Sequence, residues 1–530
     1  MRAFTHAFVA TTVLAVGCAH LPAAPAAPEA GEGARRHASW QQTLAAAHDQ
    51  LRRGCYDCLR EALAGYRAAI DDPGLTEEAR GWAVRTALLL AVRENEIGLV
   101  DGGYLALARE LAGPAADAPV DLLGFIELAE LVATGPVGGS RAAVTDGQLK
   151  AMLQLAQTQE RWEGLLRPRA GDDVVASYLW IAVVCGPYGS RLAGRDAREE
   201  ALGGLLDVPL IAYKHRTACG VSDPAPLEEL VAADPRFREI DYYLGLVALG
   251  SQRHVEPNLD LAEAHFSAAQ AWREDWPSVL LALANVAMLV EDFPRALDLF
   301  DRVVALAPED PEGLTGRIRA FTYQDRHLDA IAAADRLLAS GRNPGDAHYW
   351  RALNLARIKD YDRAWEDVER ASAALANADV PKLAGIIAMN RRELEIARQR
   401  LELARRRRRN DCETGFYLQS ILAEQRDWDP VASIAAESAA CFEADEHQLR
   451  QELEVLRASD MPDDRRARQV GRREEQLLSH ARMRASAWFN AAVANFNLAR
   501  HAEAAVFARK LTSDEYFGAR ARALLERLPH

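Results

Sequence analysis

The chain contains seven cysteines, whose side chains could form disulfides, bind a metal or carry out redox chemistry. Cys55 and Cys58 have the two-residue spacing of a redox dithiol, but that chemistry requires a βαβ setting, and the sequence around them predicts helices. We therefore interpret the pair as a local disulfide or as two packed thiols. Zinc would need four converging ligands, and no second Cys pair or His pair accompanies this one. We expect no metal site and no cofactor.

Catalytic signatures are absent from the sequence. It contains no His-Glu-x-x-His, no Gly-x-Ser-x-Gly, no phosphate loop and no Gly-x-Gly-x-x-Gly. Glu437-Ser438 matches the Glu-Ser pair that lytic transglycosylases mount beside a helical superhelix, but it falls inside an expected helix, and the accompanying Gly-Leu-Met-Gln pattern is missing. We expect a protein that is not an enzyme and has no catalytic residue.

The charge of the chain bears on its partners. A net charge of −14 and a pI near 5.5 argue against a nucleic-acid partner, because phosphates require a basic face. The densest basic run is Arg405 to Arg409. We interpret it as the carbonyl end of a helix, where arginines are favoured, and the alternative is a docking patch for an acidic partner.

The N-terminus has the pattern of an export signal. Arg2 precedes an apolar run from Ala7 to Val16, which is too short to span a bilayer. The run ends in Leu14-Ala-Val-Gly-Cys18, which resembles the bacterial lipobox, although the family prefers Leu where Ala15 stands. The resemblance implies lipidation of Cys18, export, and anchoring in the bacterial cell envelope, at the periplasmic face of the outer membrane. The alternative is an ordinary cleaved signal with an incidental cysteine.

Internal periodicity is the strongest signal in the sequence. Ala262, Ala296, Ala330 and Ala364 lie 34 residues apart, and residues four and seven positions after each are apolar. Spacings of four and three place these residues on one helical face. Pro294 stands where a second helix could begin, and Pro308 where it could end. The pattern predicts repeated helical hairpins in which small residues allow two helices to approach closely.

This pattern resembles the tetratricopeptide repeat (TPR). The resemblance implies an all-α solenoid whose hairpins stack into a right-handed superhelix. The expected organisation along the chain is a lipoprotein signal at 1–17, a Pro/Ala tether at 18–36, irregular hairpins at 37–235, the TPR array at 236–443, a charged helical insertion at 444–484, and a TPR-like unit with a capping helix at 485–530.

Two cysteine pairs are candidates for long-range disulfides in an exported protein. Cys412 opens the first helix of its hairpin and Cys441 closes the second, and an antiparallel hairpin brings those ends together. Two buried thiols are the alternative. Cys185 and Cys219 form a second candidate pair.

By analogy with the family, the first helix of each hairpin lines an inner groove. The positions expected to face it fall in three successive units: Asn285, Met288 and Leu289; Arg319, Thr322 and Tyr323; and Leu353 and Arg357. Their mixture of apolar, aromatic and Arg side chains suits an extended peptide or a helix of a partner. The alternative is that these residues merely face solvent or the adjoining helix.

Three function classes remain open from the sequence. The first is a scaffold or adaptor that binds envelope proteins or peptide segments and touches the membrane only through its lipid. The second is a structural factor in envelope or secretion assembly. The third is a cell-wall glycan binder or an unrecognised enzyme. The sequence does not determine the oligomeric state.

Overall fold

The chain is described here by a computed structural model. It describes residues 32–99, 102–114, 119–134, 146–185, 200, 202–218, 224–250 and 257–529. Every regular element in these ranges is a helix, as predicted, and none of these helices combines the length and apolarity needed to cross a membrane. The predicted signal, with Cys18, lies outside the described residues, as do Cys219 and most of the tether.

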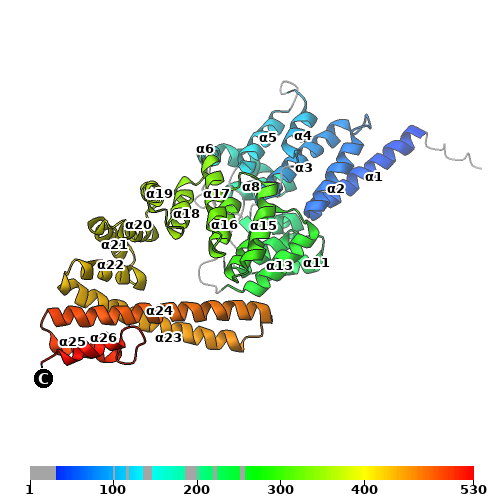
Figure 1. The fold of residues 1–530 in the computed structure, drawn as a ribbon. Coiled ribbons are helices and arrows are strands. Elements are labelled where there is room, and N and C mark those ends of the chain that lie inside the picture. The colour runs from blue at the N-terminus through cyan, green and yellow to red at the C-terminus, as the bar shows by residue number, and fades with distance from the viewer. Residues whose placement is uncertain are drawn as a thin grey trace, which may run out of the picture.

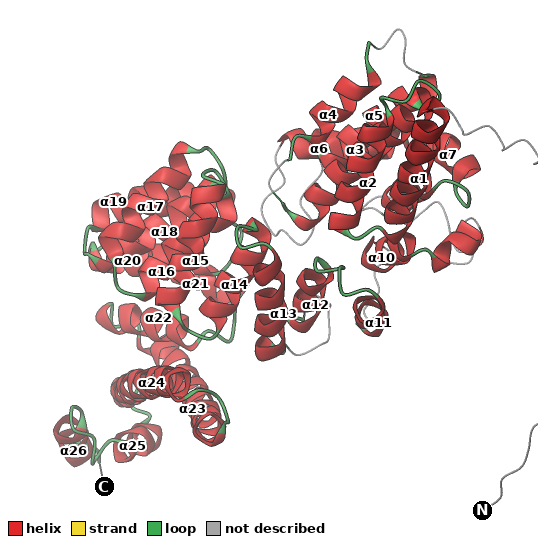
Figure 2. Cartoon of the chain, turned by 90° about the vertical axis from the view of Figure 1, so that its right-hand side faces the viewer, coloured by secondary structure: helices red, strands yellow, loops and turns green. Residues whose placement is uncertain are grey.

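The N-terminal half forms an irregular helical lobe, which Figure 2 shows at one end of the molecule. Its helices are α1 (Glu32–Arg53), α2 (Tyr56–Ala69), α3 (Thr76–Ile97), α4 (Tyr104–Ala112), α5 (Val120–Ala133), α6 (Asp146–Gln157), α7 (Gln159–Leu166), η1 (Arg167–Arg169), α8 (Val174–Val184), η3 (Gly203–Asp207), α10 (Pro209–Ala218) and α11 (Ala225–Ala233).

Two details of this lobe differ from the expectation. Helix α1 begins at Glu32, so the last residues of the expected tether are helical. The sequence of α3 predicts a long amphipathic helix, but nearly every residue from Ala83 to Glu94 is buried, because α2, α4, α5 and α8 all pack against it. Only its first turns, with Glu77 and Glu78 exposed, keep a solvent face.

The array follows as successive antiparallel hairpins, as the repeat predicted. The helices are α12 (Ile240–Ala248), α13 (Leu259–Trp272), α14 (Pro277–Leu289), α15 (Phe293–Leu306), α16 (Pro311–Tyr323), α17 (His327–Ala339), α18 (Pro344–Arg357), α19 (Tyr361–Ala374), α20 (Asp379–Asn390), α21 (Leu394–Arg407) and α22 (Cys412–Glu424). Each helix packs mainly on its neighbours along the chain. The chain is therefore an all-α solenoid of tetratricopeptide-like hairpins.

The turn inside each hairpin repeats with the same geometry. The second residue after each first helix from α14 to α22 has a positive φ, and the backbone N–H of the residue that follows it donates to a carbonyl five residues earlier, which is the Schellman arrangement. These positive-φ residues are Glu291, Asp325, Lys359, Arg392 and Arg426. Their spacing of 33 or 34 residues matches the repeat, although none of them is glycine.

Small and large side chains alternate between paired helices. The four alanines that defined the repeat are fully buried, and so are Phe266 and Phe300. Gly316 lies against Phe300, so that a Cβ built on Gly316 would stand 2.1 Å from Phe300 Cε1. In the last array unit Val431 is fully buried and lies 34 residues after Ala397, which is also fully buried, so the interval of the repeat continues to this unit. The solenoid core depends on this close approach of helices.

The charged segment expected to be helical at 444–484 belongs to one long helical hairpin. Helix α23 (Trp428–Ala458) continues the second helix of the last array unit, and α24 (Asp463–Asn497) returns along it. No residue of α24 before Ala485 is buried, which explains the charged sequence. Helices α25 (His501–Lys510) and α26 (Gly518–Glu526) then cap the C-terminal end. Figure 1 shows α23 and α24 as a long bar beneath the curved array.

Candidate functional site

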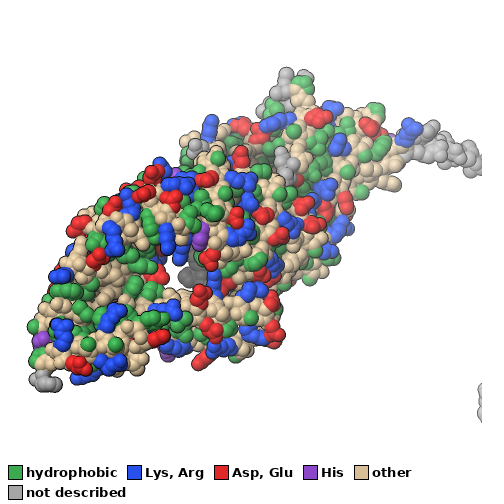
Figure 3. All heavy atoms as spheres, in the orientation of Figure 1, with side chains coloured by type: hydrophobic (Ala, Val, Ile, Leu, Met, Phe, Trp, Pro, Cys, Tyr) green, Lys and Arg blue, Asp and Glu red, His purple; other side chains and the backbone are tan. Residues whose placement is uncertain are grey.

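The inner face of the array is closed into a ring. The long α23–α24 hairpin leaves the end of the array and reaches back to its beginning, and Figure 3 shows an opening between the arch and this bar. The contact is made by the N-terminal part of α24 with α13 and with the turn between α14 and α15. A solenoid whose ends meet presents its inner face around an opening rather than along an open groove.

Arginines of α24 supply the closing contacts. Their partners lie about 180 to 205 residues earlier in the chain. The ion pairs are Arg465–Asp260 at 2.7 Å, Arg468–Asp292 at 3.4 Å and Arg473–Glu291 at 2.9 Å. Gln469 Nε2 also donates to the carbonyl of Val290 at 3.3 Å. In each pair at least one partner is largely shielded from solvent: Arg465 is 14% exposed, Asp292 23% and Glu291 16%. Salt therefore screens each of these ion pairs less than it screens a fully exposed pair.

One predicted groove residue takes part in this closure. Tyr323 stacks on Phe293 with ring centroids 5.1 Å apart, and the guanidinium of Arg472 lies 4.5 Å from the Phe293 ring centroid and 5.7 Å from that of Tyr323. Aromatic stacking and cation–π contacts each contribute about 0.5–1 kcal/mol at partly exposed sites. Tyr323 nevertheless keeps 43% of its surface exposed.

The other predicted groove residues differ in how far their side chains are exposed to solvent. Arg357 is exposed at the end of α18, and Asn285 and Arg319 are half-buried on α14 and α16. Met288 is only 8% exposed and belongs to the hydrophobic core, so its prediction as a groove residue is wrong. The period of the repeat placed this region of α14 correctly, but neighbouring positions on a helix point in different directions. Met288 therefore faces the core, while the next residue, Leu289, faces solvent.

Exposed apolar side chains recur at the ends of the first helices. Leu289 is 58% exposed, Tyr323 43% and Ile358 40%, at intervals of 34 and 35 residues. Leu289 is one of the residues that the sequence predicted to face the groove, and its side chain is exposed in the structure.

The N-terminal lobe contains a buried polar cluster that was not predicted from the sequence. Arg93 Nη2 donates to Glu239 Oε1 at 2.5 Å, and both side chains are fully buried. Arg93 also donates to the carbonyl of Gly54, and its guanidinium lies 4.1 Å from the Tyr213 ring centroid. Burial raises the pKa of Tyr213 well above its usual value, so the phenol stays neutral. The signal in the sequence was an arginine directly after the apolar run Leu88 to Val92.

This cluster is a structural joint. Glu239 also accepts a hydrogen bond from the backbone N–H of Tyr56 at 3.0 Å, so α2, α3, α10 and the start of α12 meet at one ion pair. Trp276 adds a further link, because its indole N–H donates to the carbonyl of Ile97 at 2.6 Å. These bonds fix the lobe to the beginning of the array.

Disulfides join two cysteine pairs that the structure fully describes. Cys55 pairs with Cys58, and Cys412 pairs with Cys441 across a Cα–Cα distance of 5.5 Å. The second pair is the one expected from hairpin geometry. Cys185 is also in a disulfide, whereas its predicted partner Cys219 lies outside the described residues.

The basic run and the Glu-Ser pair have partners inside the protein. Arg408 pairs with Asp379 at 2.8 Å, Arg407 donates to the carbonyl of Asn377, and Arg405 pairs with Glu437. These contacts favour the interpretation of the run as a helix end. Ser438 is buried and donates to the carbonyl of Ile434, so it does not lie free beside Glu437.

Comparisons with known proteins add a partial sequence match. No family model matches the chain. A stretch of 157 residues is 31% identical to the heat-shock protein cognate co-chaperone sgt12 of Aspergillus fumigatus, and it covers 28% of this chain and 43% of the co-chaperone. The chain thus matches less than half the length of that protein.

Several solved structures are similar in part. The APC/C hetero-tetramer Cut9–Hcn1 gives a TM-score of 0.40 at 11% identity over 94% of this chain and 98% of that one. PilF of Pseudomonas aeruginosa gives 0.34 at 18% identity over 38% and 89%. YrrB, described as a TPR protein with an unusual peptide-binding site, gives 0.29 at 15% identity over 33% and 91%. At TM-scores below 0.5 these similarities support no functional statement.

Proposed function

We propose that this protein is a non-catalytic scaffold that binds a segment of a partner protein at the inner face of its ring. The observation that carries the proposal is the recurring band of exposed apolar side chains at Leu289, Tyr323 and Ile358. An exposed apolar band on a rigid, repeated framework is typical of a binding surface rather than of a solvent face. Arginine next to such a band supplies the polar part of the contact.

The chemistry of this band defines the partner segment. Arg357 is exposed beside Ile358, and Arg319 lies one turn before Tyr323 on α16. A segment with apolar side chains at regular intervals and carboxylates between them would bury the band and pair with the arginines. An extended peptide or an amphipathic helix offers that pattern.

The cellular setting is part of the same proposal. The lipobox resemblance at Cys18 supports a lipid anchor in the bacterial envelope, with the partner an envelope protein. Metabolic labelling with an alkyne-tagged fatty acid tests the anchor directly. Label is expected on the wild-type protein and not on Cys18→Ala, and equal labelling of both would refute lipidation at this residue.

The binding surface is tested by in-cell cross-linking with quantitative mass spectrometry. Leu289→Ala together with Arg357→Ala is expected to reduce the yield of a specific cross-linked partner at least tenfold. Leu328→Ala is the matched control, because Leu328 is 71% exposed but lies on α17, a second helix. Circular dichroism checks that all variants stay helical. Equal partner yield from the double variant and the control would show that the inner face is not the contact surface.

A further inference from the structure

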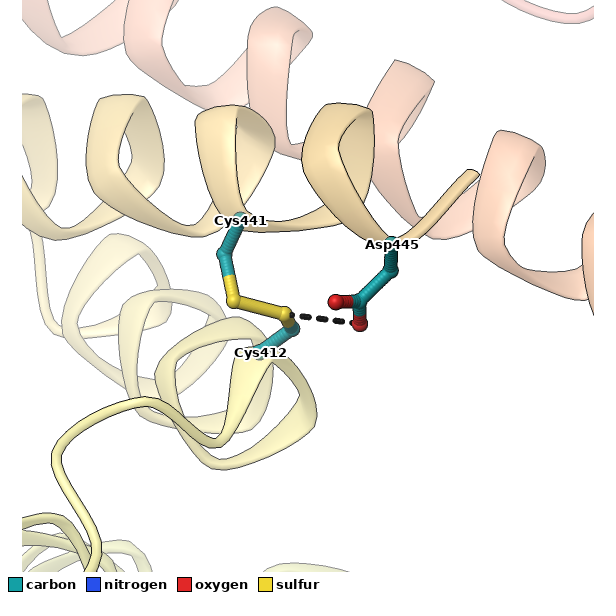
Figure 4. A group of neighbouring side chains, drawn as sticks. All are labelled: Cys412, Cys441 and Asp445. Carbon is teal, nitrogen blue, oxygen red and sulfur yellow. Dashed lines mark hydrogen bonds between the residues drawn. A yellow bond between two sulfur atoms is a disulfide. The ribbon is translucent and has the colours of Figure 1, made fainter. Parts of the chain in front are cut away.

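The Cys412–Cys441 disulfide lies beside two further side chains of metal-ligand type. Asp445 Oδ2 is 3.1 Å from Cys412 Sγ, and His480 Nδ1 is 3.9 Å from the same oxygen. One ligand atom each from Cys412, Cys441 and Asp445 lie within 4.8 Å of one another. Figure 4 shows the Asp445 carboxylate turned towards the Cys412 sulfur.

Three helices hold these four side chains. Cys412 is the first residue of α22, and Cys441 and Asp445 lie one turn apart on the same face of α23. His480 comes from α24, which packs along α23. Ligands placed on packed helices are held more precisely than ligands on loops. The sequence does not reveal this group, because its members are distant in the chain apart from Cys441 and Asp445, which are four residues apart.

One nitrogen of the His480 imidazole is buried without a hydrogen-bond partner. This atom is Nδ1, and the side chain as a whole is 12% exposed. The edge of the ring packs against Phe442, with centroids 5.3 Å apart. Buried polar atoms in native proteins nearly always have a partner, so a buried nitrogen without one, 3.9 Å from the Asp445 carboxylate, calls for an explanation.

We propose that reduction of the Cys412–Cys441 disulfide creates a binding site for a thiophilic divalent cation of the Zn²⁺ type, with Cys412, Cys441, Asp445 and His480 as ligands. Two thiolates, one imidazole nitrogen and one carboxylate oxygen form a four-coordinate set that suits Zn²⁺. Zn–ligand distances of about 2.0–2.3 Å place neighbouring ligand atoms about 3.2–3.8 Å apart in a tetrahedron. The separations from Asp445 Oδ2 to Cys412 Sγ and His480 Nδ1 are already close to that range. His480 lies outside the group of ligand atoms within 4.8 Å of one another, so its imidazole has to move towards the sulfurs when the metal binds.

Formation of the site takes two steps, reduction of the disulfide and exchange of the thiol protons for the metal. A dithiol reductant supplies two electrons and two protons, converts the disulfide into two thiols, and itself becomes a disulfide. Zn²⁺ then displaces one proton from each thiol, because the thiolate is the form that binds metal. In the oxidised protein the sulfurs carry no charge and the site binds no metal.

The position of the site gives binding a mechanical consequence. Its ligands join α22, α23 and α24 at the base of the hairpin that closes the ring. The disulfide joins only α22 to α23, whereas a bound cation would add α24 through His480. Reduced, metal-loaded protein would therefore keep the base of the hairpin fastened after the covalent link is lost. This inference does not depend on the proposed binding function.

Zinc titration of the full chain tests the site. The protein is reduced with a phosphine, freed of reductant without oxygen, and titrated with Zn²⁺ against a chromophoric chelator. One equivalent is expected to bind to reduced protein and none to oxidised protein. Cys412→Ser is expected to weaken binding at least about a hundredfold and His480→Ala at least about tenfold. Cobalt substitution should add a thiolate-to-metal absorption band that Cys412→Ser abolishes.

The controls separate this site from other sources of binding. His447→Ala removes an exposed histidine on the neighbouring turn of α23 and is expected to leave the affinity unchanged. Circular dichroism of each reduced variant checks that the helices persist. Reduction also frees Cys55 and Cys58, and binding there would survive both Cys412→Ser and His480→Ala. The inference is overturned by such insensitive binding, or if the reduced wild-type chain takes up less than one equivalent.

Discussion

The packing of Gly316 against Phe300 gives the sharpest test of the repeat. A Cβ at residue 316 would lie 2.1 Å from Cε1 and 2.3 Å from Cζ of Phe300, a ring that is fully buried. Carbon atoms pack best about 3.5–4.0 Å apart, so the ring or the helix in Gly316→Ala must move by at least about 1.4 Å. Overpacking of this kind costs about 1–3 kcal/mol, and the gain in helix propensity returns up to about 1 kcal/mol. We expect a net loss of about 1–2 kcal/mol.

A matched substitution isolates the packing contribution. Gly471 also lies inside a helix, α24, and a Cβ there would have no atom within 4 Å. Gly471→Ala should therefore show only the propensity gain and stabilise by about 0.5–1 kcal/mol. The two variants are compared in urea unfolding followed by circular dichroism. Stabilisation of Gly316→Ala to the same extent as Gly471→Ala would refute the packing of the hairpins as described.

Two further predictions concern electrostatics and backbone strain. Asp367 is 2% exposed, and although burial raises its pKa, hydrogen bonds from Arg351 and His348 lower it below the usual value. At this carboxyl the unfolded chain therefore binds more protons than the folded chain. The stabilisation by Asp367 is complete above about pH 4 and is lost as the pH falls through the lowered pKa. In urea unfolding, Asp367→Asn should cost about 3 kcal/mol at pH 7 and progressively less below pH 4, and a cost that does not change with pH would contradict this. Lys359 has φ 67°, a backbone conformation that favours glycine. Lys359→Gly should therefore raise the stability by about 0.5–1 kcal/mol in thermal unfolding, whereas Lys359→Ala should not. An equal effect of the two substitutions would contradict backbone strain at this turn.

The repeat could be found from sequence because its information is local. The interval of 34 residues and the four-and-three spacing within each helix follow from helical geometry alone, and neighbouring hairpins need no distant partner. The Cys412–Cys441 pair was predictable for the same reason, since one hairpin contains both residues. Met288 shows the limit of this reasoning, because one position around a helix decides between core and surface.

The sequence alone therefore determined the helical class, the hairpin repeat and the cysteine pairing within one unit. Only the tertiary structure revealed the buried Arg93–Glu239 pair, the return of α24 to Asp260 and Glu291, and the approach of His480 to Asp445. Each of these joins residues that are between 35 and 205 positions apart. Periodicity indicates only which face of a helix is buried. Which distant residues contact that face depends on the total curvature of many stacked hairpins. That sum is a property of the whole chain in space.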